Sequence, residues 1–221
     1  MTAAGYQIRQ CTNPACGLRY PLVEGHPFGE RCPLCLGTTE IALSRSFSPE
    51  PVTSPLAPLL RGEGSQIEAL LDNIRSGWNV GAMFRTADGL GVSKLYLCGI
   101  TPTPENKEVR KTALGAEETV RWEYSRNALE TARQLKREGC QLWALEQDAR
   151  AVAIEKADFS ADSGYLKRMV LIVGNELTGV DPALLDLCDR IVHIPMLGQK
   201  RSLNVEVAFG VAVHSLLSQM R

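Results

Sequence analysis

Four cysteines near the start of the chain have the spacing of a metal site. They form two close pairs, Cys11-x4-Cys16 and Cys32-x2-Cys35, with fifteen residues between the pairs. Two such pairs can bring four thiolates to one tetrahedral Zn²⁺, so the spacing favours zinc over buried free thiols or a disulfide. A shell of four thiolates leaves no open coordination position, so the predicted site is structural. His26, in the loop between the pairs, is therefore not expected to be a ligand.

Three further segments carry polar side chains beside apolar runs. They are NVGAMFRTA at 79–87, LIVGNELTGV at 171–180 and IPMLGQKRSLNV at 194–205. Open α/β sheets bind ligands beyond the carboxyl ends of their strands, which is where such polar residues would lie. Taken singly, each polar residue also has an ordinary interpretation. Arg85 can be a solvated helix residue, and Asn204 can equally be a helix N-cap.

These segments belong to a region in which short apolar runs alternate with amphipathic ones. The predicted strands are 67–73, 94–100, 120–124, 140–147, 169–175 and 190–196, and the predicted helices include 80–90, 128–139 and 204–220. In the last helix, Val205, Phe209, Val213 and Leu216 recur at helical spacing and are expected to face the core. Several strands are apolar on both faces, as buried parallel strands are. The alternation predicts an α/β domain with a mostly parallel sheet.

The chain divides into three parts. Residues 1–45 contain the cysteine pairs, and a segment of that size has too little core to fold without a bound metal. Residues 46–66 contain four of the twelve prolines and are interpreted as a semi-extended linker. Residues 67–221 hold the predicted α/β domain.

Composition places weaker limits on function. The net charge is −1, with 24 basic and 25 acidic residues, so the chain lacks the overall basic charge typical of nucleic-acid binders. It has no stretch of about 20 apolar residues and no signal-peptide pattern, which predicts a cytoplasmic protein without a membrane span. Cys98, Cys140 and Cys188 lie in apolar contexts and are expected to be buried free thiols.

Taken together and in this order, the three segments resemble motifs 1, 2 and 3 of the SpoU family of SPOUT methyltransferases. A further match, KTALGAE at 111–117, lies between motifs 1 and 2 as in that family. The resemblance covers residues 67–221. Three ordered motifs with matching strand and helix contexts are far more specific than any one of them.

The resemblance implies a fold and an activity. The expected fold is an α/β, SPOUT-type parallel sheet whose C-terminal part forms a deep trefoil knot, accompanied here by the small N-terminal zinc ribbon. The family binds S-adenosylmethionine in the knotted loops, works as a homodimer, and methylates a ribose 2′-hydroxyl in tRNA or rRNA. This chain is expected to do the same. The alternative is a non-catalytic RNA-binding protein that retains the SPOUT fold.

The resemblance also implies roles for individual residues. The expected catalytic residues are Arg85, Asn79, Glu176, Ser202 and Asn204. The expected cofactor-binding residues are Leu145, Glu146, Gly174, Asn175, Ile194, Met196, Ser202 and Leu203. Asn79 and Glu176 are expected to position Arg85, and Gly174 to allow close approach of backbone to the cofactor.

Arg85 is not expected to act as a base, because a guanidinium is essentially always protonated and has no free lone pair. It is expected to bind the adjacent phosphate and to stabilise the developing alkoxide. One residue departs from the family pattern: Glu206 stands where a small residue is usual, and its charge is expected to affect the approach of RNA. A Rossmann-type dinucleotide enzyme is rejected, because Gly89 and Gly91 lie at a helix end instead of in a G-x-G-x-x-G turn.

Overall fold

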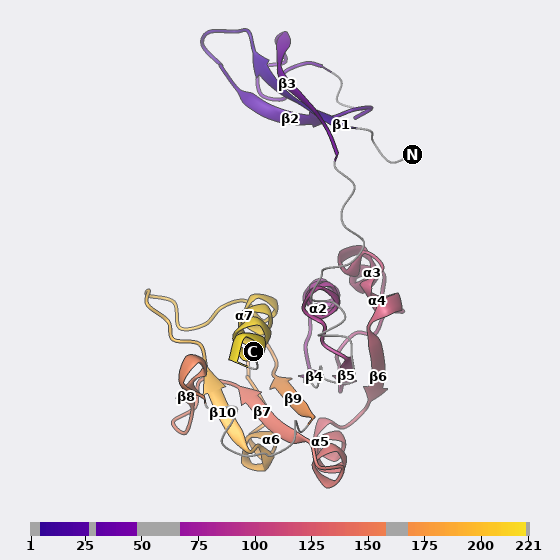
Figure 1. Cartoon of the computed structure of the whole chain (residues 1–221), viewed down its shortest axis with the longest axis vertical. Helices are drawn as coiled ribbons and strands as arrows, with labels where there is room; N and C mark the ends of the chain where they lie inside the picture. The colour runs from indigo at the N-terminus through magenta and orange to yellow at the C-terminus, as the bar shows by residue number, and fades with distance from the viewer. Residues whose placement is uncertain (1–4, 27–29, 48–66, 158–167, 220–221) are drawn as a thin grey trace. The chain divides into compact units, whose positions relative to one another are not determined.

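The structure is a computed structural model that describes residues 5–26, 30–47, 67–157 and 168–219. The chain forms two compact units, Met1–Ser54 and Pro55–Arg221 (Figure 1). Most of the predicted linker at 46–66 lies outside the described residues.

The first unit is built on a small antiparallel sheet. Its strands are β1 (Gly5–Cys11), β2 (Arg19–Val23) and β3 (Thr39–Ser46), in the order β2-β1-β3. The register between β1 and β3 shifts at Ile8 and Arg9, where the ladder is irregular. Two of the four predicted metal-binding cysteines lie on or beside this sheet, because Cys11 ends β1 and Cys35 lies four residues before β3.

The second unit contains a seven-stranded sheet in the order β6-β5-β4-β9-β7-β10-β8, and every pairing in it is parallel. The strands are β4 (Ile67–Asp72), β5 (Lys94–Cys98), β6 (Arg121–Ser125), β7 (Gln141–Leu145), β8 (Val152–Ala153), β9 (Met169–Val173) and β10 (Arg190–His193). The six predicted strands are thus confirmed within two or three residues at each end. The two-residue edge strand β8 was not predicted, because so short a run has no periodicity to detect.

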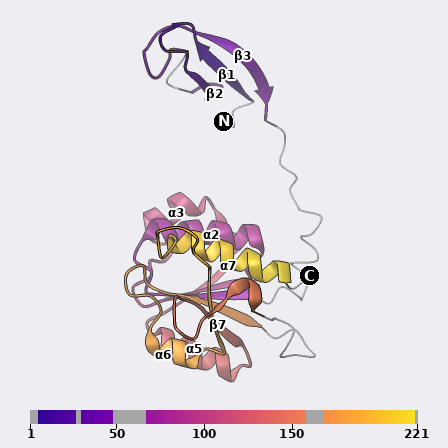
Figure 2. The same cartoon turned by 90° about the vertical axis from the view of Figure 1, so that its left-hand side faces the viewer.

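Helices cover both faces of this sheet, as parallel sheets require. They are α2 (Gly77–Leu90), α3 (Lys107–Ala113), α4 (Ala116–Thr119), α5 (Ala128–Arg137), α6 (Pro182–Leu187) and α7 (Val205–Gln219), with a 3₁₀ turn η1 (Ile154–Lys156). Figure 2 shows α2, α3 and α7 on one face and α5 and α6 on the other. In α7, Phe209, Val213 and Leu216 are fully buried in the core beneath α2, while Val205 packs against it half-buried.

The helix starts follow from capping chemistry. The N-cap of α2 is Ser76, whose hydroxyl accepts a hydrogen bond from the Asn79 N–H at 3.3 Å, so the helix begins three residues before the predicted start at 80.

Among the described residues, no helix has both the length and the apolar character needed to cross a membrane.

One buried ionic cluster connects strands of the sheet. The Glu68 carboxylate is 7% exposed and accepts bonds from Arg168 Nη2 at 2.9 and 3.0 Å and from the Tyr96 hydroxyl at 2.9 Å. Burial, together with the charge of Glu68, raises the pKa of Tyr96, so its hydroxyl remains a donor. Arg168 is the cation that neutralises Glu68 in this place.

Substituting Arg168→Ala removes that cation and leaves a buried carboxylate without a counter-charge. We expect a loss of about 2 kcal/mol in the free energy of unfolding, measured by urea denaturation, because Arg168 is itself partly exposed and breaking a fully buried pair costs more. The matched control is Arg150→Ala, which removes an arginine of similar exposure paired with Asp148 and Asp186 at the surface. The control is expected to cost less than about 1 kcal/mol. Equal losses for the two variants would contradict this account of the Glu68 cluster.

Candidate functional site

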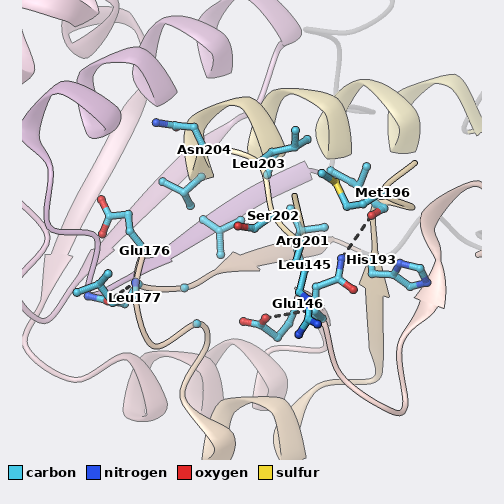
Figure 3. Close-up of a pocket in the computed structure, with 18 residues that line it drawn as sticks. Leu145, Glu146, Glu176, Leu177, His193, Met196, Arg201, Ser202, Leu203 and Asn204 are labelled. Atoms are coloured by element: carbon cyan, nitrogen blue, oxygen red, sulfur yellow. Dashed lines mark hydrogen bonds between the residues drawn. The ribbon is translucent and has the colours of Figure 1, made fainter. Parts of the chain in front are cut away.

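A cavity of about 450 Å³ opens at the carboxyl ends of three neighbouring strands, β7, β9 and β10 (Figure 3). Its walls come from the residues that follow these strands and from the segment that leads into α7. The lining residues are Leu145, Glu146, Gln147, Val173, Gly174, Asn175, Glu176, Leu177, Gly179, His193, Ile194, Met196, Arg201, Ser202, Leu203, Asn204, Val205 and Ala208. The parallel sheet thus brings predicted motifs 2 and 3 to one edge, although they lie some 20 residues apart in the sequence.

Every residue predicted to bind the cofactor lines this cavity: Leu145, Glu146, Gly174, Asn175, Ile194, Met196, Ser202 and Leu203. Of the predicted catalytic residues, Glu176, Ser202 and Asn204 also line it, whereas Asn79 and Arg85 do not. Figure 3 shows Glu176 and Asn204 towards one end, His193 and Met196 towards the other, and Ser202 between them.

The loop after β9 has a tightly closed backbone. Asn175 and Gly179 exchange two backbone hydrogen bonds of 2.9 and 3.0 Å, and the Asn175 side chain donates to the carbonyl of Asn73 at 2.7 Å. A Cβ at Gly174 would overlap the backbone of Gly179 and Val180. Close packing of this loop therefore already requires a glycine at position 174, and the expected approach of the cofactor to its backbone stays a prediction.

Glu146 holds the same loop from the neighbouring strand. Its carboxylate accepts from the Val180 N–H at 2.9 Å and from the Gln147 N–H at 2.8 Å. Gly179 has a φ of +73°, and a side chain there would overlap the Glu146 carboxylate. Glu146 therefore lines the cavity, and its carboxylate is already hydrogen-bonded to two backbone N–H groups.

Glu176 connects the loop to the first turn of α2. Its carboxylate accepts from the N–H groups of Arg75 and Ser76 at 2.9 and 3.2 Å, and from Asn79 Nδ2 at 3.1 Å. Burial alone would raise the pKa of the Glu176 carboxyl, but these hydrogen bonds outweigh it and hold the pKa below its usual value. A carboxylate at this position also complements the positive end of the helix dipole.

Asn204 extends this line of polar groups to α7. Its Nδ2 donates to Asn79 Oδ1 at 3.3 Å, and its Oδ1 accepts from the Glu206 N–H at 2.9 Å. Asn204 is therefore the N-cap of α7, as one interpretation of the sequence predicted, and also a neighbour of Asn79. Glu176, Asn79 and Asn204 form one hydrogen-bonded row, called here the polar row.

Arg85 is not brought to the polar row. It lies six residues after Asn79 on α2, about 9 Å further along the helix axis, and its side chain is exposed. Within the described ranges, Asn79 and Glu176 bind one another and the start of α2, and neither holds the Arg85 guanidinium. The expectation that these two residues position Arg85 is thus not met in a single copy of the chain.

Glu206, the residue that departs from the family pattern, lies in the first turn of α7. It accepts a hydrogen bond of 3.4 Å from the hydroxyl of Thr86, which connects the first turn of α7 to α2, and it does not line the cavity. The expected effect of its charge on the approach of RNA stays a prediction.

Several lining residues were not predicted, among them Gln147, Leu177, His193, Arg201 and Ala208. Gln147 Nε2 donates to the Ile194 carbonyl at 3.4 Å, which joins the ends of β7 and β10. His193 Nδ1 is buried and has no hydrogen-bond partner within the described part of the chain. The available signal for His193 and Gln147 was their position at the carboxyl ends of predicted strands.

The four predicted metal ligands converge in the first unit. The Sγ atoms of Cys11, Cys16, Cys32 and Cys35 all lie within 4.8 Å of one another, with Cys11–Cys35 at 3.4 Å and Cys16–Cys32 at 3.7 Å. A tetrahedron with Zn–S bonds of about 2.3 Å has S–S edges of about 3.8 Å, so the arrangement fits zinc. His26 is not in this group. The Cys35 N–H, against the opposing effect of burial, lowers the pKa of the Cys32 thiol to about 7.

Of the remaining cysteines, Cys98 and Cys140 are buried as predicted, and Cys188 is partly exposed. All seven cysteines are free thiols in this structure.

Comparison with known proteins identifies relatives of the second unit. Residues 66–214 match the family model described as the SpoU rRNA Methylase family. The 23S rRNA (guanosine-2′-O-)-methyltransferase RlmB of Acinetobacter baylyi is 31% identical over 77% of this chain and 68% of its own length. The tRNA (guanosine(18)-2′-O)-methyltransferase of Aquifex aeolicus is 29% identical over 74% of each chain.

Solved structures agree with this assignment. The A. aeolicus TrmH/SpoU tRNA modifying enzyme matches with a TM-score of 0.61 and 30% identity, covering 70% of this chain and 75% of that one. The AdoMet-bound rRNA methyltransferase from Sinorhizobium meliloti matches with a TM-score of 0.64 and 25% identity, covering 72% and 58%. The residues that the family model matches contain all three motifs and the residues that line the cavity. The chain belongs to the SpoU rRNA methylase family.

Proposed function

We propose that this chain is an S-adenosylmethionine-dependent methyltransferase that modifies a ribose 2′-hydroxyl in tRNA or rRNA. One observation carries the proposal: the cavity at the ends of β7, β9 and β10 collects every residue predicted to bind the cofactor. Family membership supports the reaction, because the relatives compared above are named as RNA 2′-O-methyltransferases.

The cavity suits S-adenosylmethionine in chemistry and size. Leu145, Met196 and Leu203 offer apolar surface, and the buried His193 Nδ1 offers a hydrogen-bonding atom without a protein partner among the described residues. A volume of about 450 Å³ is in the usual range for small-molecule sites. When bound, the cofactor supplies an electrophilic methyl group on a sulfonium.

The polar row supplies orientation next to this cavity. Glu176 fixes the first turn of α2, Asn79 is held between Glu176 and Asn204, and Asn204 fixes the first turn of α7. These groups and Ser202 are in place to orient a ribose hydroxyl, which is the main task when the methyl donor is already reactive. Arg85 binds the phosphate beside the target ribose and stabilises the developing alkoxide, while the proton passes to phosphate or water.

A homodimer accounts for the position of Arg85. The side chain is exposed on α2 and lies outside the cavity of its own chain. The same helix and the neighbouring α7 also carry exposed apolar residues, namely Trp78 on α2 and Val207 and Val211 on α7. We infer that these helices pair with a second copy, so that Arg85 of the partner subunit reaches the phosphate beside the target ribose.

The trefoil knot expected from the family is a further inference. Two features support it: β9 lies between β4 and β7, and the chain returns from β10 to pack α7 against α2 and β9. The segment making that return, at 194–204, is also one wall of the cavity. A cytoplasmic location stays a prediction.

The first test is methyl transfer from labelled S-adenosylmethionine to total RNA from a strain lacking this gene. We expect 2′-O-methylnucleosides with the wild-type chain. Arg85→Ala should reduce transfer at least about 100-fold, because one stabiliser of developing charge is lost, while cofactor binding stays intact. The control is Arg133→Ala, which removes an exposed arginine from α5 on the other face of the sheet. Neither cofactor binding nor transfer by the wild type would favour the non-catalytic alternative, whereas cofactor binding without transfer to RNA would indicate a different methyl acceptor.

Mixing two inactive variants tests whether Arg85 acts across the dimer. One variant is Arg85→Ala, and the other is Ser202→Trp, which fills the cavity and should abolish cofactor binding. Co-refolded in equal amounts, they should recover about a quarter of the wild-type rate, because half of the dimers then contain one intact composite site. If Arg85 serves the cavity of its own chain, no mixed dimer has a complete site and no activity returns.

We also propose that the four cysteines hold one structural zinc ion, for which the convergence of their Sγ atoms is the support. Cys35→Ser should reduce bound zinc from about one ion per chain to near zero and unfold the first unit, because that unit has little core of its own. Elemental analysis measures the first effect and amide NMR the second, while cofactor binding by the second unit should persist. Cys188→Ser, at a cysteine outside the cluster, should retain the metal. Full zinc content in Cys35→Ser would contradict the proposed ligand set.

A further inference from the structure

The sheet of the first unit has two unlike faces. In an antiparallel sheet, residues directly opposite each other share a face. The register therefore places Val23, Tyr6 and Arg45 in one row across the sheet, and Pro21, Ile8 and Leu43 in the next. A third row contains Arg19, Gln10 and Glu40. This side of the sheet is called here the open face.

Part of the opposite face, around Arg9 and Tyr20, is covered by the chain itself. Arg9 projects there and is only 3% exposed, because it bonds to Thr39 Oγ1 and Gln7 Oε1, both at 2.8 Å, and lies 3.6 Å from Glu30. The Tyr20 hydroxyl donates to the Arg31 carbonyl next to Cys32, so the cysteine loop folds against this side. The metal cluster and its loops therefore leave the open face uncovered within the unit.

The open face combines apolar and aromatic surface with arginine. Val23 and Leu43 are 39% and 38% exposed, and Phe47, which follows β3, is 51% exposed with its ring 5.5 Å from that of Tyr6. Arg45 lies in the same row as Tyr6, and Arg19 lies at the other end of the face, where it donates to Gln10 at 3.3 Å. Apolar side chains that stay exposed to water add no stability to the unit. Exposed apolar patches of this kind mark interaction surfaces.

This combination matches the chemistry of a single strand of RNA. Unpaired bases stack on aromatic and apolar side chains, and the phosphates between them pair with arginine. A duplex does not offer its base faces to such a surface. A protein partner would find the apolar groups equally useful. The three rows contain two exposed arginines, Arg19 and Arg45, against one acid, Glu40, which lies in the row of Arg19. This net positive charge, with Arg45 at the end of the face away from the acid, favours a partner with spaced negative charges.

We propose that the open face binds single-stranded RNA and so adds to the second unit a contact with the RNA that it methylates. The unit lies outside residues 66–214, the part shared with the SpoU family, so this contact is additional to the methyltransfer site. The identity of the RNA as a methylation substrate rests on the proposed function. The binding surface itself is inferred from the residues in the three rows of the sheet, independently of the proposed function.

Two double variants of the full chain provide a matched test. Arg45→Ala with Leu43→Ala removes one cation and one aliphatic group from the open face. Arg31→Ala with Ile41→Ala removes the same two kinds of group elsewhere, since Ile41 pairs with Arg9 and lies on the opposite face with 52% exposure. Both variants should retain the zinc content of the wild type, which establishes that the unit is folded.

The probe is a fluorescein-labelled single-stranded 12-mer of uridine, and its binding is followed by anisotropy. The open-face variant should bind about tenfold or more weakly, and the control within twofold of wild type. Arg45→Ala alone should lower the slope of log K against log salt by about 0.7, the value for one phosphate contact in single strands. Equal affinities for both double variants would overturn the proposal. So would unchanged affinity accompanied by a change in oligomeric state, which would identify the face as a contact between copies.

The methyl-transfer assay separates this inference from the proposed function. If both hold, the open-face variant raises the KM for RNA while kcat and cofactor affinity stay unchanged. A second outcome is that the wild type transfers methyl groups while the open-face variant changes neither KM nor 12-mer binding. This outcome would support the proposed function and contradict the proposed binding surface. A third outcome is that the open-face variant loses 12-mer binding while the wild type transfers no methyl groups to RNA. This outcome would support the proposed binding surface and contradict the proposed function.

Discussion

The carboxylate of Glu176 is the group on which the architecture of the site depends. It accepts three hydrogen bonds, one from the first turn of α2 and two from the residues just before the helix, and its lowered pKa keeps it charged across the neutral range. Without that charge, the backbone donors at the start of α2 would face the loop after β9 with no acceptor. The loop and the helix therefore hold each other in position, and Asn79 and Asn204 extend the constraint to α7.

A second constraint acts on the other side of the loop. Gly174 and Gly179 permit a turn so tight that no side chain fits, and Glu146 binds the N–H of Val180 from the neighbouring strand. The two acidic residues that line the cavity, Glu146 and Glu176, thus accept hydrogen bonds from backbone N–H groups and hold the cavity walls in position. Other lining groups are available to meet a ligand, among them apolar side chains, the backbone at the strand ends and the polar side chains of Gln147, Arg201 and Ser202.

Much of this arrangement could be predicted from the sequence because the strands of the second unit are short, apolar and separated by amphipathic helices. The motifs fall at the ends of those strands, and a parallel sheet brings such ends to one edge. Tertiary position was harder to predict. The six-residue spacing on a helix already separates Asn79 and Arg85 by about 9 Å and turns their side chains in different directions, so only the resemblance placed Arg85 beside Glu176. Likewise, the role of Gly174 in closing the loop and the contact of Glu206 with Thr86 depend on partners that are distant in sequence.

The polar row has a consequence for how the protein is made. Its hydrogen bonds join residues separated by 97 and 125 positions, and the contacts of Glu176 with the start of α2 span 100 and 101. A chain emerging from the ribosome can form β4, α2 and β5 long before Glu176 and Asn204 have been synthesised. Until then the first turn of α2 lacks the Glu176 carboxylate as an acceptor, and the cavity lacks the lining residues Glu176 and Asn204. The capacity to bind a ligand there thus arises only after Asn204 has been synthesised, so a nascent chain that ends before this residue cannot form the complete site.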